Sequence, residues 1–283
     1  MAEGYLKKAQ IAVELAQSKG ADMSEAYISA GKELSIEVSN QQVEAMKMAK
    51  EHGLGMRVIV QGKMGFAYTS DIEEQSIQQL VEQAMANAEK AHSDEFNRVP
   101  KTNKSYPQLV LLDEKIIDVP IEEKIALAKE IEVQARAYDK RVKITESSTY
   151  QDAIYSVSIF NSQGVAESYR GAYCGAFVYL VAEENNDSQT GFGLKYSVKY
   201  EDLDPVKVGQ EAAKKAVRML GAKEIGTQKA AVVLDPYVAT NFLGVLAPAL
   251  SGEAVQKGKS VFAGKVGSNV SSEVITIIDH GSL

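Results

Sequence analysis

The spacing of apolar side chains changes along the chain, and each spacing predicts a type of secondary structure. Apolar residues recur at helical intervals over residues 2–19, and Gly20 follows as a helix stop. The period then falls to two over residues 34–38 and 56–60, where alternating apolar and polar positions are typical of strands. Glycine–lysine pairs lie between such runs and predict hairpin turns at Gly31-Lys32 and Gly62-Lys63.

A second amphipathic stretch predicts a helix from about residue 71 to 91, with Ser70 or Asp71 as its N-cap. Over residues 93–107 this pattern gives way to polar residues and two prolines, which indicates a domain boundary. The predicted domains, both of the α+β class, are residues 1–104 and 105–283.

The second half continues with helices and closely spaced strands. Helices are predicted over residues 121–138 and from Asp204-Pro205 to Leu220-Gly221. Four or five strands are predicted between them, over residues 142–148, 153–160, 165–173, 176–183 and 191–198. Turns at residues 161–164 and 185–187 predict an antiparallel meander sheet packed by helices, and a further short buried strand is expected at Ala231–Leu234. No internal sequence repeat is evident.

Composition narrows the functional classes. Hydrophobic content of 45% with 24% charged residues is ordinary for a soluble globular protein. The net charge of -7 is spread along the chain without a cluster of Lys and Arg, which argues against a nucleic-acid partner. The single cysteine fits a reducing compartment, and no apolar run approaches the roughly 18 residues of a membrane span. A cytoplasmic protein with no membrane partner is therefore expected.

The most specific pattern lies beyond residue 230. Val233-Leu234-Asp235-Pro236 leads into a helical run that ends near Leu250. It is followed by Lys257-Gly258-Lys259-Ser260-Val261-Phe262-Ala263-Gly264 and by the strand-like Val274–Asp279. This order of elements resembles the TldD/PmbA family of zinc peptidases, once called modulators of DNA gyrase. In the D-type subunit of that family, the helix carries a His-Glu-x-x-x-His motif.

The metal-binding positions of that motif hold other residues in this chain. Laid on the run from residue 257, the two His positions fall on Leu243 and Pro248, and the Glu position falls on Gly244. None of these side chains can donate electrons to zinc. The resemblance therefore implies an E-type subunit with no catalytic or metal-binding residue of its own, and zinc is expected only in a D-type partner. The remaining donors are scattered along the sequence: His52, His92, His280 and Cys174.

Several residues allow two interpretations. Pro248 either ends the helix at Ala247 or kinks it to shape a former cleft. The resemblance places six residues beside the family's peptide cleft: Lys257, Gly258, Lys259, Ser260, Phe262 and Gly264. The alternative is a surface loop whose glycines serve turns only. Cys174 fits a small buried apolar residue better than a nucleophile, because no histidine is placed near it.

Three functions follow from this sequence. The first is the non-zinc subunit of a metallopeptidase that acts on unfolded or small peptides, which the resemblance implies together with a D-type partner. The second is a stand-alone peptide-binding or scaffolding homodimer. The third, an independent hydrolase using Cys174 or a serine, lacks an evident base. Family members continue beyond the position of Leu283, so a truncated second domain with an exposed apolar edge is expected.

Overall fold

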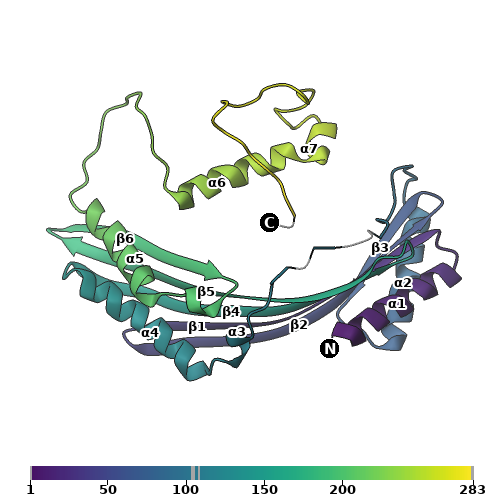
Figure 1. The fold of residues 1–283 in the computed structure, drawn as a ribbon, viewed down its shortest axis with the longest axis horizontal. Helices are drawn as coiled ribbons and strands as arrows, with labels where there is room; N and C mark the ends of the chain where they lie inside the picture. The colour runs from purple at the N-terminus through teal and green to yellow at the C-terminus, as the bar shows by residue number, and fades with distance from the viewer. Residues whose placement is uncertain (1, 103–105, 108, 282–283) are drawn as a thin grey trace. The chain divides into compact units, whose positions relative to one another are not determined.

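The computed structural model describes residues 2–102, 106–107 and 109–281, and divides into two compact units (Figure 1). The first unit is Met1–Ala222 and the second is Lys223–Leu283. The first unit contains a six-stranded antiparallel sheet, in which the strands lie in the order β3-β2-β1-β4-β5-β6. Its strands are β1 (Met23–Ser39), β2 (Gln42–Val60), β3 (Lys63–Thr69), β4 (Val142–Asn161), β5 (Ala166–Glu184) and β6 (Asp187–Ser197).

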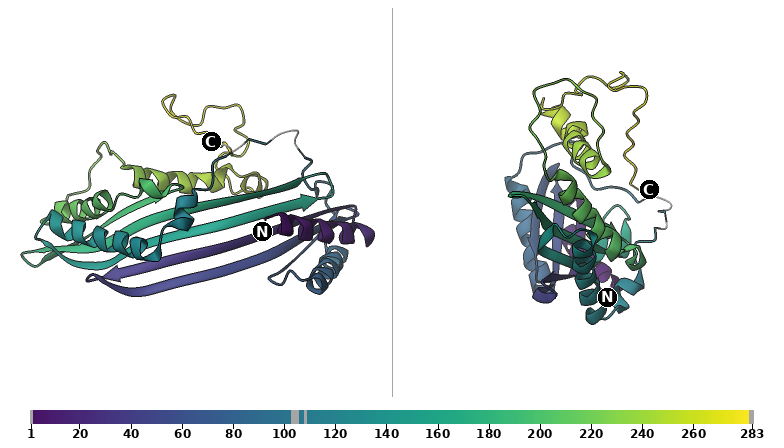
Figure 2. Two further views of the ribbon diagram at one scale, coloured as in Figure 1. Left: turned by 60° about the horizontal axis from the view of Figure 1, so that its bottom comes forward. Right: turned by 90° about the vertical axis from the view of Figure 1, so that its left-hand side faces the viewer.

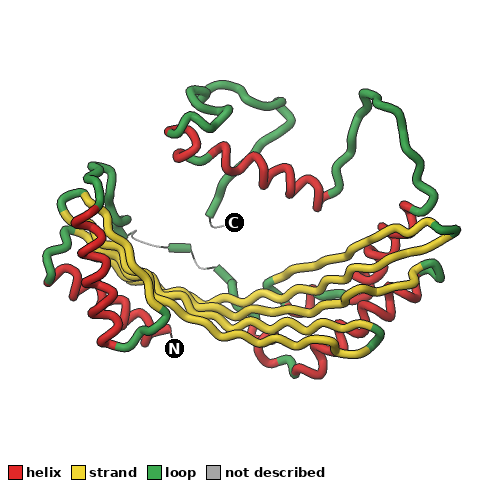
Figure 3. The backbone as a smooth tube through the Cα atoms, turned by 180° about the vertical axis from the view of Figure 1, so that it is seen from behind, coloured by secondary structure: helices red, strands yellow, loops and turns green. Residues whose placement is uncertain are grey.

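Helices cover one face of this curved sheet at its two ends (Figures 1, 2 and 3). The helices of the first unit are α1 (Ala2–Ser18), α2 (Glu74–Lys90), α3 (Glu114–Asp118), α4 (Ile121–Tyr138), the 3-10 helix η1 (Tyr200–Asp202) and α5 (Pro205–Met219). Helices α1 and α2 pack at one end, and α4 and α5 pack against each other and the sheet at the other end. The mixed α+β class, with helices packed on an antiparallel sheet, is thereby confirmed.

The order of elements occurs twice in the first unit. A helix, three meandering strands and a second helix make up α1-β1-β2-β3-α2, and the same order returns as α4-β4-β5-β6-α5. The two halves meet where β1 pairs antiparallel with β4. From this central pair outward, the strands follow in chain order on each side, as β1-β2-β3 and as β4-β5-β6. The topology is therefore duplicated, although no repeat is evident in the amino-acid sequence.

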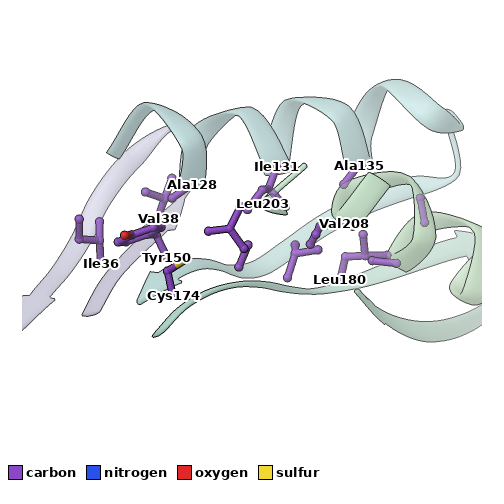
Figure 4. Packing of buried hydrophobic residues seen from close by; sticks show 14 of the residues in the cluster. Ile36, Val38, Ala128, Ile131, Ala135, Tyr150, Cys174, Leu180, Leu203 and Val208 are labelled. Carbon is purple, nitrogen blue, oxygen red and sulfur yellow. The ribbon is translucent and has the colours of Figure 1, made fainter. Parts of the chain in front are cut away.

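Two hydrophobic clusters form the core, one under each pair of helices. The first lies between α4, α5 and the sheet, and Tyr150, Ile131 and Leu180 are among its fully buried side chains (Figure 4). Glycines let the helices approach the outer strands closely. A Cβ on Gly65 would lie 2.0 Å from the Ala84 carbonyl oxygen of α2. Such contact distances leave no room for a side chain.

A buried carboxylate fixes the turn between β1 and β2. Asn40 and Gln41 form this turn with positive φ angles of 49° and 61°. Glu132 on α4 is 1% exposed and accepts the Asn40 N–H at 3.0 Å and the Gln41 N–H at 2.8 Å. The Glu132 carboxylate thus joins helix α4 to the turn between β1 and β2 and satisfies two backbone N–H groups.

The structure corrects several predicted strand boundaries. Gly31-Lys32 lies inside β1 and is not a turn. The predicted breaks near residues 149–152 and 174–175 are absent, because β4 and β5 each run unbroken through them. The turns after residues 161 and 184 and the Gly62 turn are confirmed. The boundary at residue 104 stays a prediction, and one sheet runs through both predicted domains.

The second unit contains the helices α6 (Pro236–Leu246) and α7 (Gly252–Gln256), with the 3-10 helix η2 (Ala247–Leu250) between them. Within its described residues, 223–281, there is no strand and no buried side chain. The strand predicted at Ala231–Leu234 is therefore wrong, and Val233 there is 97% exposed. The strand-like stretch Val274–Asp279 is also irregular and exposed.

Candidate functional site

The three residues that the resemblance aligns with a zinc motif lie on and just after α6. Asp235 caps this helix by accepting the Val238 N–H at 3.0 Å. Leu243 and Gly244 lie in its last turns, and a Cβ on Gly244 would meet no atom within 4 Å. The α-helix ends at Leu246, and Pro248 lies in η2. The proline therefore follows the end of the helix, in agreement with the first of its two interpretations.

The chemistry of these three side chains does not suit a metal site. Leu and Pro have hydrocarbon side chains and Gly has none, whereas zinc takes imidazole, thiolate or carboxylate ligands. Over the described ranges of the chain, no three His, Cys, Asp or Glu side chains come together as a group that could hold a metal ion.

The candidate cleft residues form a tight turn system after α7. Gly258 has a φ of 66°, its N–H bonds to the Val255 carbonyl at 3.1 Å, and the Lys259 N–H bonds to the Ala254 carbonyl at 2.8 Å. These two bonds form a Schellman motif, which glycine favours at its left-handed position. Gly258 thus has a local structural reason to be glycine.

The other predicted cleft residues lie next to this motif. The Ser260 hydroxyl donates to the Ala249 carbonyl at 2.5 Å and accepts the Phe262 N–H at 3.0 Å. Lys257 pairs with Glu253 on α7. Gly264 adopts a φ of 72° in the next turn. The structure brings these residues together in one loop, and their contact with a peptide stays a prediction.

A hollow that sequence reasoning missed lies on the sheet face opposite the helices of the first unit. Leu34 and Ile36 are buried under α4, so the alternation of the strand puts Glu33 and Ser35 on the other face. A cavity of about 460 Å³ opens over four neighbouring strands there. Its lining comprises Ser29, Gly31, Glu33, Glu51, His52, Gly53, Ala153, Ile154, Tyr155 and Tyr173.

Glycine and tyrosine shape this hollow. Gly31 and Gly53 have no side-chain atom within 4 Å of an added Cβ, so the backbone of β1 and β2 is left uncovered between them. The ring of Tyr155 lies over Gly171 in the neighbouring strand, where an added Cβ would be 2.4 Å from the ring. Burial raises the pKa of Tyr173, and the negative charge of Glu33 raises it further. The hollow therefore combines aromatic walls with carboxylates.

A buried polar cluster lies on the helix side of the same sheet. Lys124 of α4 donates to Asp152 of β4 at 2.6 Å and to the Ile116 carbonyl at 2.8 Å. Tyr150 donates to the same Asp152 oxygen at 2.9 Å. Cys174 lies in this core, and burial raises the pKa of its thiol to about 12. The interpretation of Cys174 as a small buried residue is confirmed, because such a thiol stays protonated near neutral pH.

Comparison with known families defines the class of the chain. Models of a PmbA/TldA metallopeptidase match in chain order: domain 1 over residues 24–88, the central domain over residues 114–220 and the C-terminal domain over residues 227–283. The chain belongs to the PmbA/TldD family.

Individual relatives agree with this assignment. Metalloprotease PmbA of Escherichia coli O157:H7 is 27% identical over 280 residues, covering 96% of this chain and 61% of the relative. A metalloprotease TldD homolog of Haemophilus influenzae is 28% identical, covering 82% of this chain and 50% of the relative. The chain thus spans about 60% of the length of the E. coli relative, whose full length includes further residues.

Solved structures share the fold. A candidate modulator of DNA gyrase from Bacteroides thetaiotaomicron superposes with a TM-score of 0.86 at 22% identity, covering 94% of this chain and 61% of that one. TldE from Thermococcus kodakarensis gives a TM-score of 0.76 at 17% identity, covering 91% and 58%. Among the described residues, none of the helices is both long and apolar enough to cross a membrane.

Proposed function

We propose that this chain is the non-zinc, E-type subunit of a cytoplasmic TldD/TldE-type metallopeptidase that degrades or matures small or unfolded peptides. The observation that carries the proposal is a family match over residues 227–283 combined with the absence of any metal-donor side chain at Leu243, Gly244 and Pro248. In this proposal the D-type partner supplies zinc and the general base. This chain helps to enclose the peptide, and the face of its curved sheet opposite the helices of the first unit, which carries a hollow, supports that role.

The test is reconstitution. A D-type protein of the same family is assayed on an unfolded peptide alone, with this chain, and with an unrelated protein of similar size. Hydrolysis is expected to rise only with this chain, and to stop when a chelator removes zinc. An unchanged rate of the D-type protein with and without this chain contradicts the subunit proposal.

Metal content gives a second, independent measurement. This chain, purified and dialysed, is expected to carry no stoichiometric zinc, while the D-type protein prepared in parallel carries it and so validates the assay. One tightly bound equivalent of zinc in this chain would overturn the E-type assignment.

The alternative function is a stand-alone peptide-binding or scaffolding homodimer. The free edge of β2 favours it, because β3 pairs only with Leu54–Val60 and leaves residues 42–53 paired on one side among the described strands. Met46 and Met48 on this stretch are 53% and 49% exposed. Unpaired strand edges with apolar side chains promote association with another chain. A stable dimer that binds peptide and leaves the D-type activity unchanged would favour this alternative.

A further inference from the structure

The hollow on the sheet face opposite the helices of the first unit holds two carboxylates, those of Glu33 and Glu51. Glu33 of β1 and Glu51 of β2 are diagonal neighbours, because Gly31 is the residue directly opposite Glu51. Both side chains are exposed, and neither belongs to an ion pair between described residues. Arg57 and Glu25, further along the same two strands and on the same face, do form such a pair at 2.5 Å.

Aromatic rings stand beside these carboxylates. Tyr155 and Tyr173 line the same hollow, and Tyr155 meets Tyr169 edge to face with ring centroids 6.4 Å apart. Rings held in this way offer faces that attract cations. A second hollow of about 290 Å³ shares Glu33 and Tyr173, continues along β1 and has Lys47 of β2 in its lining. The two hollows together leave room for an extended chain and not only for a single ion.

We propose that this hollow, built from Glu33, Glu51, Tyr155 and Tyr173, binds the basic side chain of an extended peptide. The carboxylates complement a lysine or arginine charge, the rings contact its apolar stem and charged head, and the uncovered Gly31–Gly53 floor lets a peptide backbone come close. This inference rests on the proposed function, since it takes a peptide as the ligand. It adds a preference for basic residues, set by a site far along the sequence from residues 257–264.

The test compares two peptides on the 283-residue chain by fluorescence anisotropy. One is a dye-labelled unfolded peptide that contains lysines, and the other has norleucine at the same positions. The lysine peptide is expected to bind at least tenfold more tightly, which corresponds to about 1.4 kcal/mol. Its affinity should fall as salt rises, because exposed charges are screened. Equal affinities for the two peptides, or no binding of either one, would overturn the proposal.

Variants then assign the preference to this site. Glu33→Gln with Glu51→Gln is expected to weaken the lysine peptide about tenfold and to leave the norleucine peptide within twofold. Glu37→Gln is the matched control, since Glu37 lies on the same face of β1 and lines neither hollow. An equal loss in Glu37→Gln, or no loss in the double variant, refutes the site. Because both glutamates are exposed, an unchanged thermal melt is expected to confirm folding.

Two further arms separate the possible failures. Spermidine, a free polyamine, should compete only weakly, and competition as strong as that of the lysine peptide would replace the peptide with a free amine as the ligand and overturn the proposal. Peptide binding is measured without the D-type protein. A failed reconstitution therefore contradicts the subunit proposal alone, whereas a lost lysine preference contradicts this site alone.

Discussion

The buried pair of Lys124 and Asp152 offers the sharpest prediction about stability. The two side chains are 6% and 5% exposed, and the ammonium and the carboxylate are 2.6 Å apart. The remaining hydrogen bonds of the pair go to the Ile116 carbonyl and the Tyr150 hydroxyl. Lys124→Met removes the cation and leaves the Asp152 charge in the core with only the tyrosine as a donor. Asp152→Asn leaves the cation in the same position without its counter-charge.

The magnitude follows from this burial. Removing one member of a buried ion pair destabilises a protein by about 3–5 kcal/mol, because the other charge stays in a medium that solvates it poorly. Each single variant should therefore lose about 3–5 kcal/mol, or roughly 10 °C in melting temperature for a domain of this size. The double variant Lys124→Met/Asp152→Asn removes both charges and keeps an acceptor for Tyr150. It should be about 2 kcal/mol more stable than either single variant.

Urea unfolding of the full chain, followed by far-UV circular dichroism, measures these differences as shifts of the midpoint at constant slope. The chain has no tryptophan, so backbone ellipticity is the suitable signal. Single variants that lose less than about 1 kcal/mol would show that water solvates the pair. A double variant that loses the sum of both singles would show that the two side chains do not interact. Either result refutes the reasoning.

Three further predictions concern single side chains. Gly65→Ala should destabilise the chain by about 1–3 kcal/mol in urea unfolding, because the new methyl group meets the α2 backbone. Gly53→Ala is the control: an added Cβ there has ordinary contacts only, so the urea midpoint should change little. Equal effects of the two variants would contradict the packing argument. The Cys174 thiol, with its pKa raised to about 12 by burial, should resist Ellman's reagent at pH 8 until the chain is unfolded, and rapid labelling of the folded chain would contradict this. Hydrogen bonds from Arg141 lower the pKa of Asp139 to about 2, so the carboxylate stabilises the fold above pH 4 and this contribution fades as the pH falls toward 2. The difference in unfolding free energy between the unmodified chain and Asp139→Asn should shrink over the same pH range. A difference that stays constant with pH would exclude the interaction.

The helices could be predicted from the sequence because their signals are local. The helix predicted over residues 121–138 has those bounds in the structure, and the helix predicted from Pro205 ends at Met219, one residue before the predicted end. Apolar residues three and four positions apart, together with an N-cap and an N1 proline, depend on neighbours in the sequence. The N-cap of α2 was misplaced, since Glu73 precedes the helix and Asp71 bonds to the Glu73 N–H.

The strands could be predicted only in part, because a glycine can lie either in a turn or inside a strand under a neighbouring side chain. Gly31 looks like a turn residue in the sequence, and Gly175 falls between two predicted strands, yet each lies inside a long strand. In the structure, the ring of Tyr196 on the next strand covers Gly175, where an added Cβ would lie 2.5 Å from it. This contact depends on which strands are neighbours, and local sequence does not contain that information.

The two candidate sites differ in the same way. The loop over residues 257–264 is continuous in the sequence, so a family motif could reveal it. The hollow draws Glu33, Glu51, Tyr155 and Tyr173 from four strands, two in each half of the duplicated topology. Alternation shows which side chains share a face of one strand, but only the pairing of β1 with β4 brings the two halves together. Sequence reasoning lacked that pairing and therefore missed the hollow.

The duplicated topology also makes β1 a shared element of two hydrophobic clusters. Leu34, Ile36 and Val38 of β1 belong to the hydrophobic cluster under α4 and α5, which lie in the other half of the first unit. Ala26 and Ile28 of the same strand belong to the cluster under α1 and α2. Strand β1 thus supplies apolar side chains to both clusters, and separating the halves would expose one of these sets to water. The polar stretch over residues 93–107 therefore links two topological halves that share β1 as a common core element.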